Sequence, residues 1–201
     1  SLMRKAGAKD YKKYAKKIIS ETKRKPVSLE VFADDNLSMV RQAKKINSWG
    51  RNVYVKIPIT NSRGKYTTSA IKELSKQKIK LNITAVYSAK QTKKILNVIN
   101  KDSKVLISIF VGRAADTGKD PIPEIKKSIK LSKKFKNVKI LWASVREPYN
   151  YLQAKQMGCH LITVPPSIID KITNFGKSYN ELTISTVKAF LEDSKKSKFK
   201  I

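Results

Sequence analysis

The chain has 201 residues, which is enough to bury a substantial core in one domain. Its hydrophobic content of 40% and charged content of 29% are typical of a soluble globular protein, and no run approaches the roughly 18 apolar residues of a membrane helix. A single cysteine, Cys159, excludes an intramolecular disulfide and favours a reducing compartment. We therefore expect a cytoplasmic protein.

The formal net charge of +29 comes from 44 lysine and arginine residues against 15 acidic ones. Such a charge suggests a nucleic-acid partner, because basic surfaces release counterions from phosphates. The basic residues are mostly lysines spread along the whole chain, however, without an RNP-type aromatic motif, zinc spacing or basic zipper region. We interpret the charge as a solvated lysine-rich surface that also attracts small phosphorylated substrates, and we do not expect a nucleic-acid partner.

Strand-like and helix-like stretches alternate along the chain, which is typical of an α/β protein with a parallel sheet. Periodicity and end signals predict helices over residues 10–25 and 35–49, around 70–79, from the Ser88–Gln91 capping box, from Pro121, over 148–157, over 167–172 and over 180–195. Strands are predicted over residues 27–33, 52–60, 81–87, 105–112, 138–144 and 160–164, with a loop over 113–120.

The predicted strands begin about 22 to 33 residues apart, which is the length of a βα unit. Six such units fit a (β/α)8 TIM barrel that lacks its first two strands better than a small doubly wound sheet. We expect a single barrel domain over residues 1–201, truncated at its N-terminus and ending in a C-terminal helix. The abrupt beginning at Ser1-Leu2-Met3, with no strand before it, suggests a start inside a longer protein or a secondary start at Met3.

Lys56 lies inside the apolar strand over residues 52–60, near its C-terminal end. A lysine between Val55 and Ile57 must extend to solvent or lose its proton. A desolvated, neutral amine is a nucleophile that forms a Schiff base with a carbonyl substrate. The alternative is a lysine that only marks the solvent end of a strand.

Other polar residues stand near the C-terminal ends of the predicted strands, where barrels place their catalytic groups. Glu30 is the only acid inside a strand core, so it is a candidate acid/base beside Lys56. A structural ion pair between the two is the alternative, although a buried pair stabilises a fold poorly. Arg113 and Arg146 follow two strands and could clamp a phosphate bidentately, or could be solvated loop cations.

Further candidates share strand faces by the two-residue period: Asn82 with Thr84, and Ser108 with Phe110, while Ser144 closes the fifth strand. One histidine, one cysteine and scattered carboxylates offer no metal site, and the glycines form no nucleotide-binding motif. We therefore expect no metal and no cofactor.

Five runs in register along the chain resemble the transaldolase family, most closely its short, fructose-6-phosphate aldolase-like branch. They are VSLEVFA (27–33), VYVKIPIT (53–60), LNITAVY (81–87), FVGR (110–113) and ASVR (143–146). The resemblance implies a (β/α)8 barrel of class I aldolase type. It also implies that Lys56 is the Schiff-base lysine, that Glu30 is the acid/base acting through a bound water, and that Thr84 helps hold that water.

The resemblance further implies a set of substrate contacts. Asn82 and Ser108 match residues that bind the dihydroxyacetone part of the substrate, and Arg113, Ser144 and Arg146 match the phosphate site. The implied activity is transfer of a dihydroxyacetone unit between sugar phosphates, as in the pentose phosphate pathway. The segment 180–195 resembles the terminal helix that packs on a neighbouring subunit, so a homo-oligomer is expected.

Two positions bear on which reaction the family resemblance implies. Phe110 stands where aldolase-type members usually carry tyrosine, and Glu30 replaces their glutamine, so both favour transfer over free aldol cleavage. A fructose-6-phosphate or dihydroxyacetone aldolase remains the alternative enzyme, and an inactive, truncated basic binding protein is the alternative of another class. Ser1-Leu2-Met3 resembles the end of the Thr-Asn-Pro-Ser-Leu motif after the second strand, so the first strand with its catalytic aspartate and the asparagine of the second strand are expected to be absent.

Overall fold

The computed structural model describes residue 3 and residues 6–197 of the chain. These residues divide into two compact units, with the boundary between Val164 and Pro165. The first unit contains the sheet and its helices, and the second contains α9 (Pro166–Ile172) and α10 (Tyr179–Ser197). Ser1 and Leu2, on which the expected resemblance at the front of the chain rests, lie outside the described residues.

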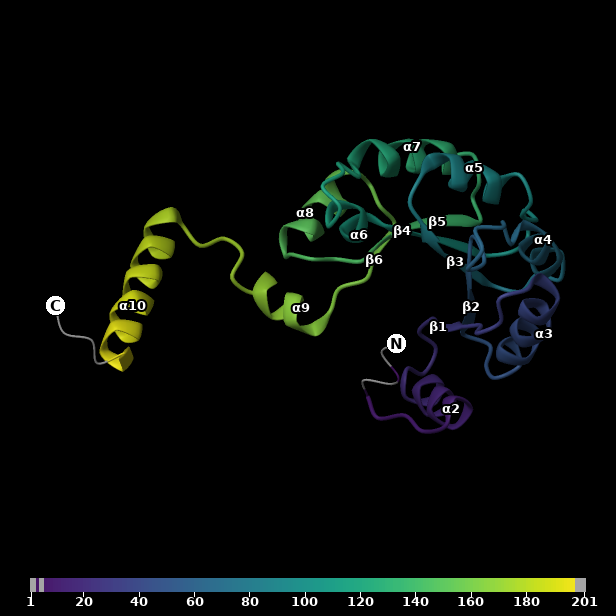
Figure 1. Cartoon of the computed structure of the whole chain (residues 1–201), viewed down its shortest axis with the longest axis horizontal. Coiled ribbons are helices and arrows are strands. Elements are labelled where there is room, and N and C mark those ends of the chain that lie inside the picture. The colour runs from purple at the N-terminus through teal and green to yellow at the C-terminus, as the bar shows by residue number, and fades with distance from the viewer. Residues whose placement is uncertain (1–2, 4–5, 198–201) are drawn as a thin grey trace. The chain divides into compact units, whose positions relative to one another are not determined.

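Six parallel strands form one sheet, and their order in the sheet is their order in the chain. They are β1 (Val27–Glu30), β2 (Val53–Pro58), β3 (Leu81–Val86), β4 (Val105–Phe110), β5 (Val138–Ala143) and β6 (Leu161–Ile162). The sheet curls into a half-barrel, and helices α3, α4, α5, α7 and α8 lie in an arc around its outer side (Figure 1). This confirms the prediction of an α/β fold built from six of the βα units of a TIM barrel.

Helices connect the strands of the first unit: α2 (Tyr11–Glu21), α3 (Asn36–Asn47), α4 (Thr68–Lys76), α5 (Ala89–Leu96), α6 (Val111–Ala115), α7 (Ile122–Ser132) and α8 (Tyr149–Gln156). Polar side chains begin several of them. Asp10 and Asp35 accept backbone N–H groups at the starts of α2 and α3, and Ser88 and Gln91 form the predicted capping box of α5. These caps fix where each helix leaves the sheet.

The main core lies between the outer face of the sheet and the surrounding helices. In β2, Val53, Val55 and Ile57 are buried, whereas the alternate residues Tyr54 and Lys56 are half-buried. The apolar strand expected over residues 52–60 is therefore fully buried on its outer face only. The reason is the curl of the six strands, which packs only the convex face under helices.

The segment after β4 also differs from the sequence prediction. Residues 113–120 were expected to be a loop, but the chain turns directly from Phe110 into the short helix α6. Gly112 allows this turn. A Cβ built there would lie 1.7 Å from the backbone oxygen of Ser144, so any larger residue would separate α6 from the end of β5.

Candidate active site

Lys56 and Glu30 lie side by side on neighbouring strands at the same level of the sheet. The register pairs Glu30 of β1 with Lys56 of β2, and Lys56 in turn with Asn82 of β3. The Lys56 Nζ is 3.6 Å from Oε2 of Glu30, and the two side chains are 28% and 43% exposed. The amine is therefore less deeply buried than the sequence suggested, but a carboxylate lies within reach of it.

Thr84 follows on β3, one pleat beyond Asn82 on the same inner face. Thr84 is buried, and its hydroxyl has no hydrogen-bond partner among the described protein groups. A buried hydroxyl without a partner is uncommon and points to a group from outside the protein. The strand pairing shifts just here, between Ile83 and Val86, and Ala85 has a φ of 57°, so a β-bulge sets the direction of Thr84.

A chain of hydrogen bonds crosses the floor of the site below Lys56. Ser108 donates to Oδ1 of Asn82 over 2.7 Å, and the amide nitrogen of Asn82 donates to the Ser28 hydroxyl over 2.9 Å. Asn82 and Ser108 are both buried. Both terminal atoms of the Asn82 amide are therefore engaged, each by a serine hydroxyl that can donate or accept. The network thus holds the Asn82 amide in place at the level of Lys56 in the sheet.

These groups line one cavity of about 750 Å³ on the inner face of the sheet. Its wall contains Lys56, Asn82, Thr84 and Ser108 from the centre of the sheet. Leu106, Leu141 and Ala143 form an apolar cluster on the same wall, packed against Tyr54 and Phe110. Burial raises the pKa of the Tyr54 phenol, which is consistent with this apolar setting.

The two arginines that were expected to share a phosphate are placed differently. Arg113 lines the cavity, with its guanidinium 5.5 Å from the centre of the Phe110 ring, in a cation–π contact. Arg146, in contrast, is not among the described residues that line the cavity, and its guanidinium is bound by Asp116. Ser144 does line the cavity and has a φ of 65°, a left-handed conformation that is rare outside glycine.

The hydrogen bonds from Arg146 raise its pKa above the ordinary value and lower that of the Asp116 carboxyl. Nε of Arg146 is 3.0 and 2.9 Å from the two carboxylate oxygens, and NH2 is 2.6 Å from one of them. This is a bidentate ion pair at the rim of the sheet.

Eight of the nine predicted site residues line one cavity or directly contact a residue that lines it. The ninth is Arg146, whose guanidinium binds Asp116 at the C-terminal end of α6. Sequence reasoning missed Ser28 and Asp116. Ser28 stands two residues before Glu30, so the two-residue period of a strand could have placed it on the inner face. No sequence signal identifies Asp116 as the partner of Arg146, because that contact joins residues 30 positions apart.

Two other kinds of feature are absent from the described part of the chain. Across residue 3 and residues 6–197, no group of three or more His, Cys, Asp or Glu side chains is placed to hold a metal ion. No helix in the described part of the chain is both long and apolar enough to cross a membrane.

The fold and the cavity together define a class of protein. Its strands are parallel and consecutive, and its polar groups and cavity lie on the inner face toward the carboxyl ends, as in enzymes built on βα barrels. Comparison with known sequences makes the assignment narrower. The model of the family Transaldolase/Fructose-6-phosphate aldolase matches residues 1–201, and the chain belongs to that family.

Individual relatives agree with this assignment. A protein named "Probable transaldolase" from Methanococcus vannielii is 33% identical over 194 residues, which cover 96% of this chain and 83% of the relative. Proteins with the same name from Nitrosopumilus maritimus and a Thermoanaerobacter species are 34% and 31% identical, over 86% and 88% of this chain and 72% and 76% of their own lengths.

Proposed function

We propose that the protein is a transaldolase-type enzyme that transfers a dihydroxyacetone unit between sugar phosphates through a Schiff base on Lys56. The observation that carries this proposal is the pair of Lys56 and Glu30, 3.6 Å apart on neighbouring strands of a family barrel. The names of the relatives, "Probable transaldolase", support the same reaction class.

In the proposed reaction the amine of Lys56 attacks the ketose carbonyl and forms a carbinolamine, which loses water to give an iminium ion. Glu30 takes the proton that the amine must lose and returns one to the departing oxygen, directly or through a water. The unpartnered hydroxyl of Thr84, in the same cavity, supplies a hydrogen-bonding group for that water.

Carbon–carbon cleavage then follows from the iminium ion. The electron pair of the broken bond moves into the iminium and leaves an enamine on Lys56. The hydroxyl on the departing carbon loses its proton to Glu30, through the water, and becomes the carbonyl of the aldose phosphate that leaves. A second aldose phosphate accepts the three-carbon unit by the reverse steps. The hydroxyl groups of the enamine fragment would face the amide of Asn82 and the hydroxyl of Ser108, which line the same cavity and would hold its orientation.

The phosphate of the sugar would bind at the rim, where Arg113 and Ser144 line the cavity. Arg113 lies against the Phe110 ring, which limits the directions in which its guanidinium can point. The interaction positions the substrate and stabilises its charge without taking part in bond breaking.

The direct test is borohydride reduction in the presence of fructose 6-phosphate, followed by mass spectrometry of the peptides. We expect one reduced adduct, on the peptide that contains Lys56. An adduct on another lysine, or no adduct under conditions where a known aldolase is trapped, contradicts the proposed mechanism. A product assay with and without an aldose-phosphate acceptor separates transfer from aldol cleavage: release of dihydroxyacetone without an acceptor would favour the aldolase alternative.

We also propose that the protein forms a homo-oligomer through α10. All the described residues of this helix are exposed, including the apolar Leu182, Val187, Phe190 and Leu191. Exposed apolar side chains at helical spacing are typical of an interface. Light scattering at micromolar concentration tests this, and a monomer would contradict it.

A further inference from the structure

We propose that Asp116 sets the affinity of the site for phosphate, because it holds the guanidinium of Arg146 on helix α6 and a phosphate must displace it. This inference rests on the proposed function for the location of the phosphate. It adds a residue that competes with the substrate for an arginine, and so determines how strongly the site selects phosphorylated sugars.

The first support is the geometry of the ion pair. Asp116 binds the side of the guanidinium formed by Nε and NH2, at 2.6 to 3.0 Å. That side offers two parallel N–H donors, which is the geometry that a phosphate uses in a bidentate contact. A carboxylate and a phosphate cannot occupy the same donors, so binding of one releases the other.

The second support is the way in which the backbone holds Arg146 on α6. A Cβ built on Gly112 would lie 2.8 Å from Cγ of Arg146, so the stem of the arginine lies directly on the glycine. Asp116 comes one turn later, and its backbone N–H donates to the oxygen of Gly112 over 2.9 Å. Gly112 therefore lies against the aliphatic part of the Arg146 side chain, and Asp116 binds its guanidinium.

The third support is the position of the pair relative to the cavity. Arg113 and Ser144 line the cavity, while Arg146 is two residues after Ser144 and its guanidinium is on α6. Arg146 and Asp116 are 46% and 45% exposed, so the side chains have room to separate. The exchange would require rotation about the outer bonds of the arginine, which moves its guanidinium from Asp116 to a phosphate at the rim.

The exchange has a consequence for specificity. A phosphate carries up to two negative charges and can replace the single charge of Asp116 on the guanidinium, whereas a neutral sugar cannot. While Asp116 is bound, the positive charge of Arg146 is available only to an anion that displaces Asp116. Competition with Asp116 therefore lowers the phosphate affinity that Arg146 can supply, while a neutral sugar gains nothing from this arginine.

The experiment measures binding of inorganic phosphate by calorimetry to the unmodified protein and to Asp116→Asn. We expect the variant to bind phosphate ~3- to ~10-fold more tightly, the size of effect that a partly exposed charge pair produces. Glu73→Gln is the matched control. It removes one negative charge from a half-exposed ion pair, with Lys44 at 3.4 Å, between helices on the outer side of the sheet, and it should leave phosphate affinity unchanged.

A double-mutant cycle identifies Arg146 as the group through which Asp116 acts. In the Arg146→Gln background, Asp116→Asn should have no effect on phosphate affinity, because the arginine for which the two anions compete is gone. A weaker or unchanged affinity in Asp116→Asn overturns the inference, since it would mean that Asp116 supports Arg146 as a phosphate ligand or does not affect it. An Asp116→Ala variant, checked for native circular dichroism, guards against an effect specific to asparagine.

Two readouts keep this inference separate from the proposed function. Borohydride trapping with dihydroxyacetone, which has no phosphate, reports only on the amine of Lys56. If trapping at Lys56 succeeds and no variant binds phosphate at millimolar concentration, competition between Asp116 and phosphate is wrong and the Schiff base stands. If phosphate binding responds as expected and trapping fails, the competition stands and the Schiff-base mechanism is wrong.

Discussion

The two ends of the sheet carry positive charge in different ways. At the carboxyl end, Lys56 contacts a carboxylate, Arg113 contacts an aromatic ring and Arg146 is bound by Asp116. At the amino end, a second cavity of about 390 Å³ is lined by Lys101, Lys104, Lys136 and Lys139 together with Tyr54, Asp102, Val105, Leu106 and Asn137. All four of these lysines are exposed.

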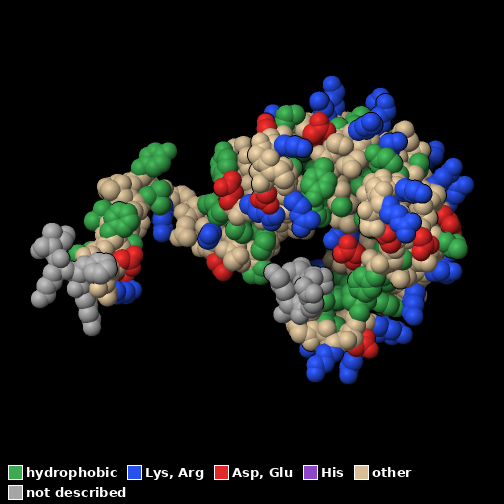
Figure 2. Space-filling view, viewed as in Figure 1, with side chains coloured by type: hydrophobic (Ala, Val, Ile, Leu, Met, Phe, Trp, Pro, Cys, Tyr) green, Lys and Arg blue, Asp and Glu red, His purple; other side chains and the backbone are tan. Residues whose placement is uncertain are grey.

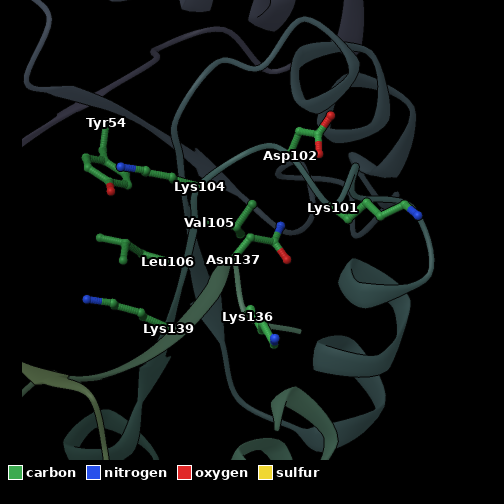
Figure 3. Close-up of a pocket in the computed structure, with 9 residues that line it drawn as sticks. All are labelled: Tyr54, Lys101, Asp102, Lys104, Val105, Leu106, Lys136, Asn137 and Lys139. Carbon is green, nitrogen blue, oxygen red and sulfur yellow. The ribbon is translucent and has the colours of Figure 1, made fainter. Parts of the chain in front are cut away.

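Figure 3 shows how these lysines lie. Lys104 and Lys139 point to the same side of the strands as Tyr54, whereas Lys101 and Lys136 point away from it. Lysines are also scattered over the helices that surround the sheet (Figure 2). Positive charge is abundant everywhere in this chain, so charge alone does not distinguish a site. What distinguishes Lys56, Arg113 and Arg146 is that each contacts a carboxylate or an aromatic ring.

Replacement of Lys56 by methionine should have the largest effect. Lys56→Met keeps the length of the side chain and removes the nucleophile, so borohydride adducts and turnover should fall to background. The matched control is Lys104→Met, which removes a lysine that lines the cavity at the amino end of the sheet and not the cavity that contains Lys56. It should leave both adduct formation and turnover unchanged. If the two variants behave alike, the difference between the two ends of the sheet is not functional.

Replacement of Glu30 by glutamine should have the next largest effect. Glu30→Gln keeps the shape and removes the proton acceptor, so turnover should fall by about 10²- to 10⁴-fold. Phosphate affinity should not change, because Glu30 is not at the phosphate rim. Glu73→Gln is the control, since Glu73 pairs with Lys44 between helices on the outer side. Equal turnover in both variants would remove Glu30 from the mechanism.

Replacement of Gly112 by alanine should destabilise the carboxyl end of the sheet. The added Cβ would lie 1.7 Å from the backbone oxygen of Ser144, and overpacking of this kind lowers the free energy of unfolding by about 1–3 kcal/mol or more. Gly64→Ala serves as a comparison. Gly64 has a φ of 74° with open space around it, so only the backbone strain of about 1–2 kcal/mol applies. Urea unfolding measures both, and a smaller loss in Gly112→Ala would mean that α6 moves freely.

Replacement of Tyr11 by phenylalanine should have the smallest effect. The Tyr11 hydroxyl donates to the backbone oxygen of Glu30 over 3.1 Å and accepts its backbone N–H over 2.9 Å. Loss of these bonds at a partly buried position should cost about 1 kcal/mol in the free energy of unfolding. Tyr14→Phe, on the same helix, should cost less. An equal loss of unfolding free energy in the two variants would show that the Tyr11 hydroxyl does not stabilise β1.

Much of the fold follows from local patterns that a sequence displays directly. The alternation of strand and helix predicts the parallel sheet, and the two-residue period predicts that Asn82 and Thr84 share a face. The capping box of Ser88 and Gln91 depends on neighbours in the sequence and was also predicted correctly. The family resemblance, carried by five short runs, is confirmed by the match over residues 1–201.

The parts that could not be predicted depend on contacts between distant residues. The phosphate clamp expected from Arg113 and Arg146 is altered by Asp116, which reaches Arg146 only because α6 folds back onto β5. The strand expected over 160–164 is reduced to Leu161 and Ile162, which pair with Leu141 and Trp142 of β5. Sequence periodicity carries no information about either effect.

The order of the strands has a consequence for how the chain folds. Each strand after β1 pairs with the strand that precedes it in the sequence, so every pairing in the sheet closes a loop of one or two helices. The loop entropy lost at each pairing is therefore smaller than it would be for strands far apart in the chain. The sheet can therefore grow strand by strand in the direction of synthesis, with each new β-strand docking on an edge that is already in place.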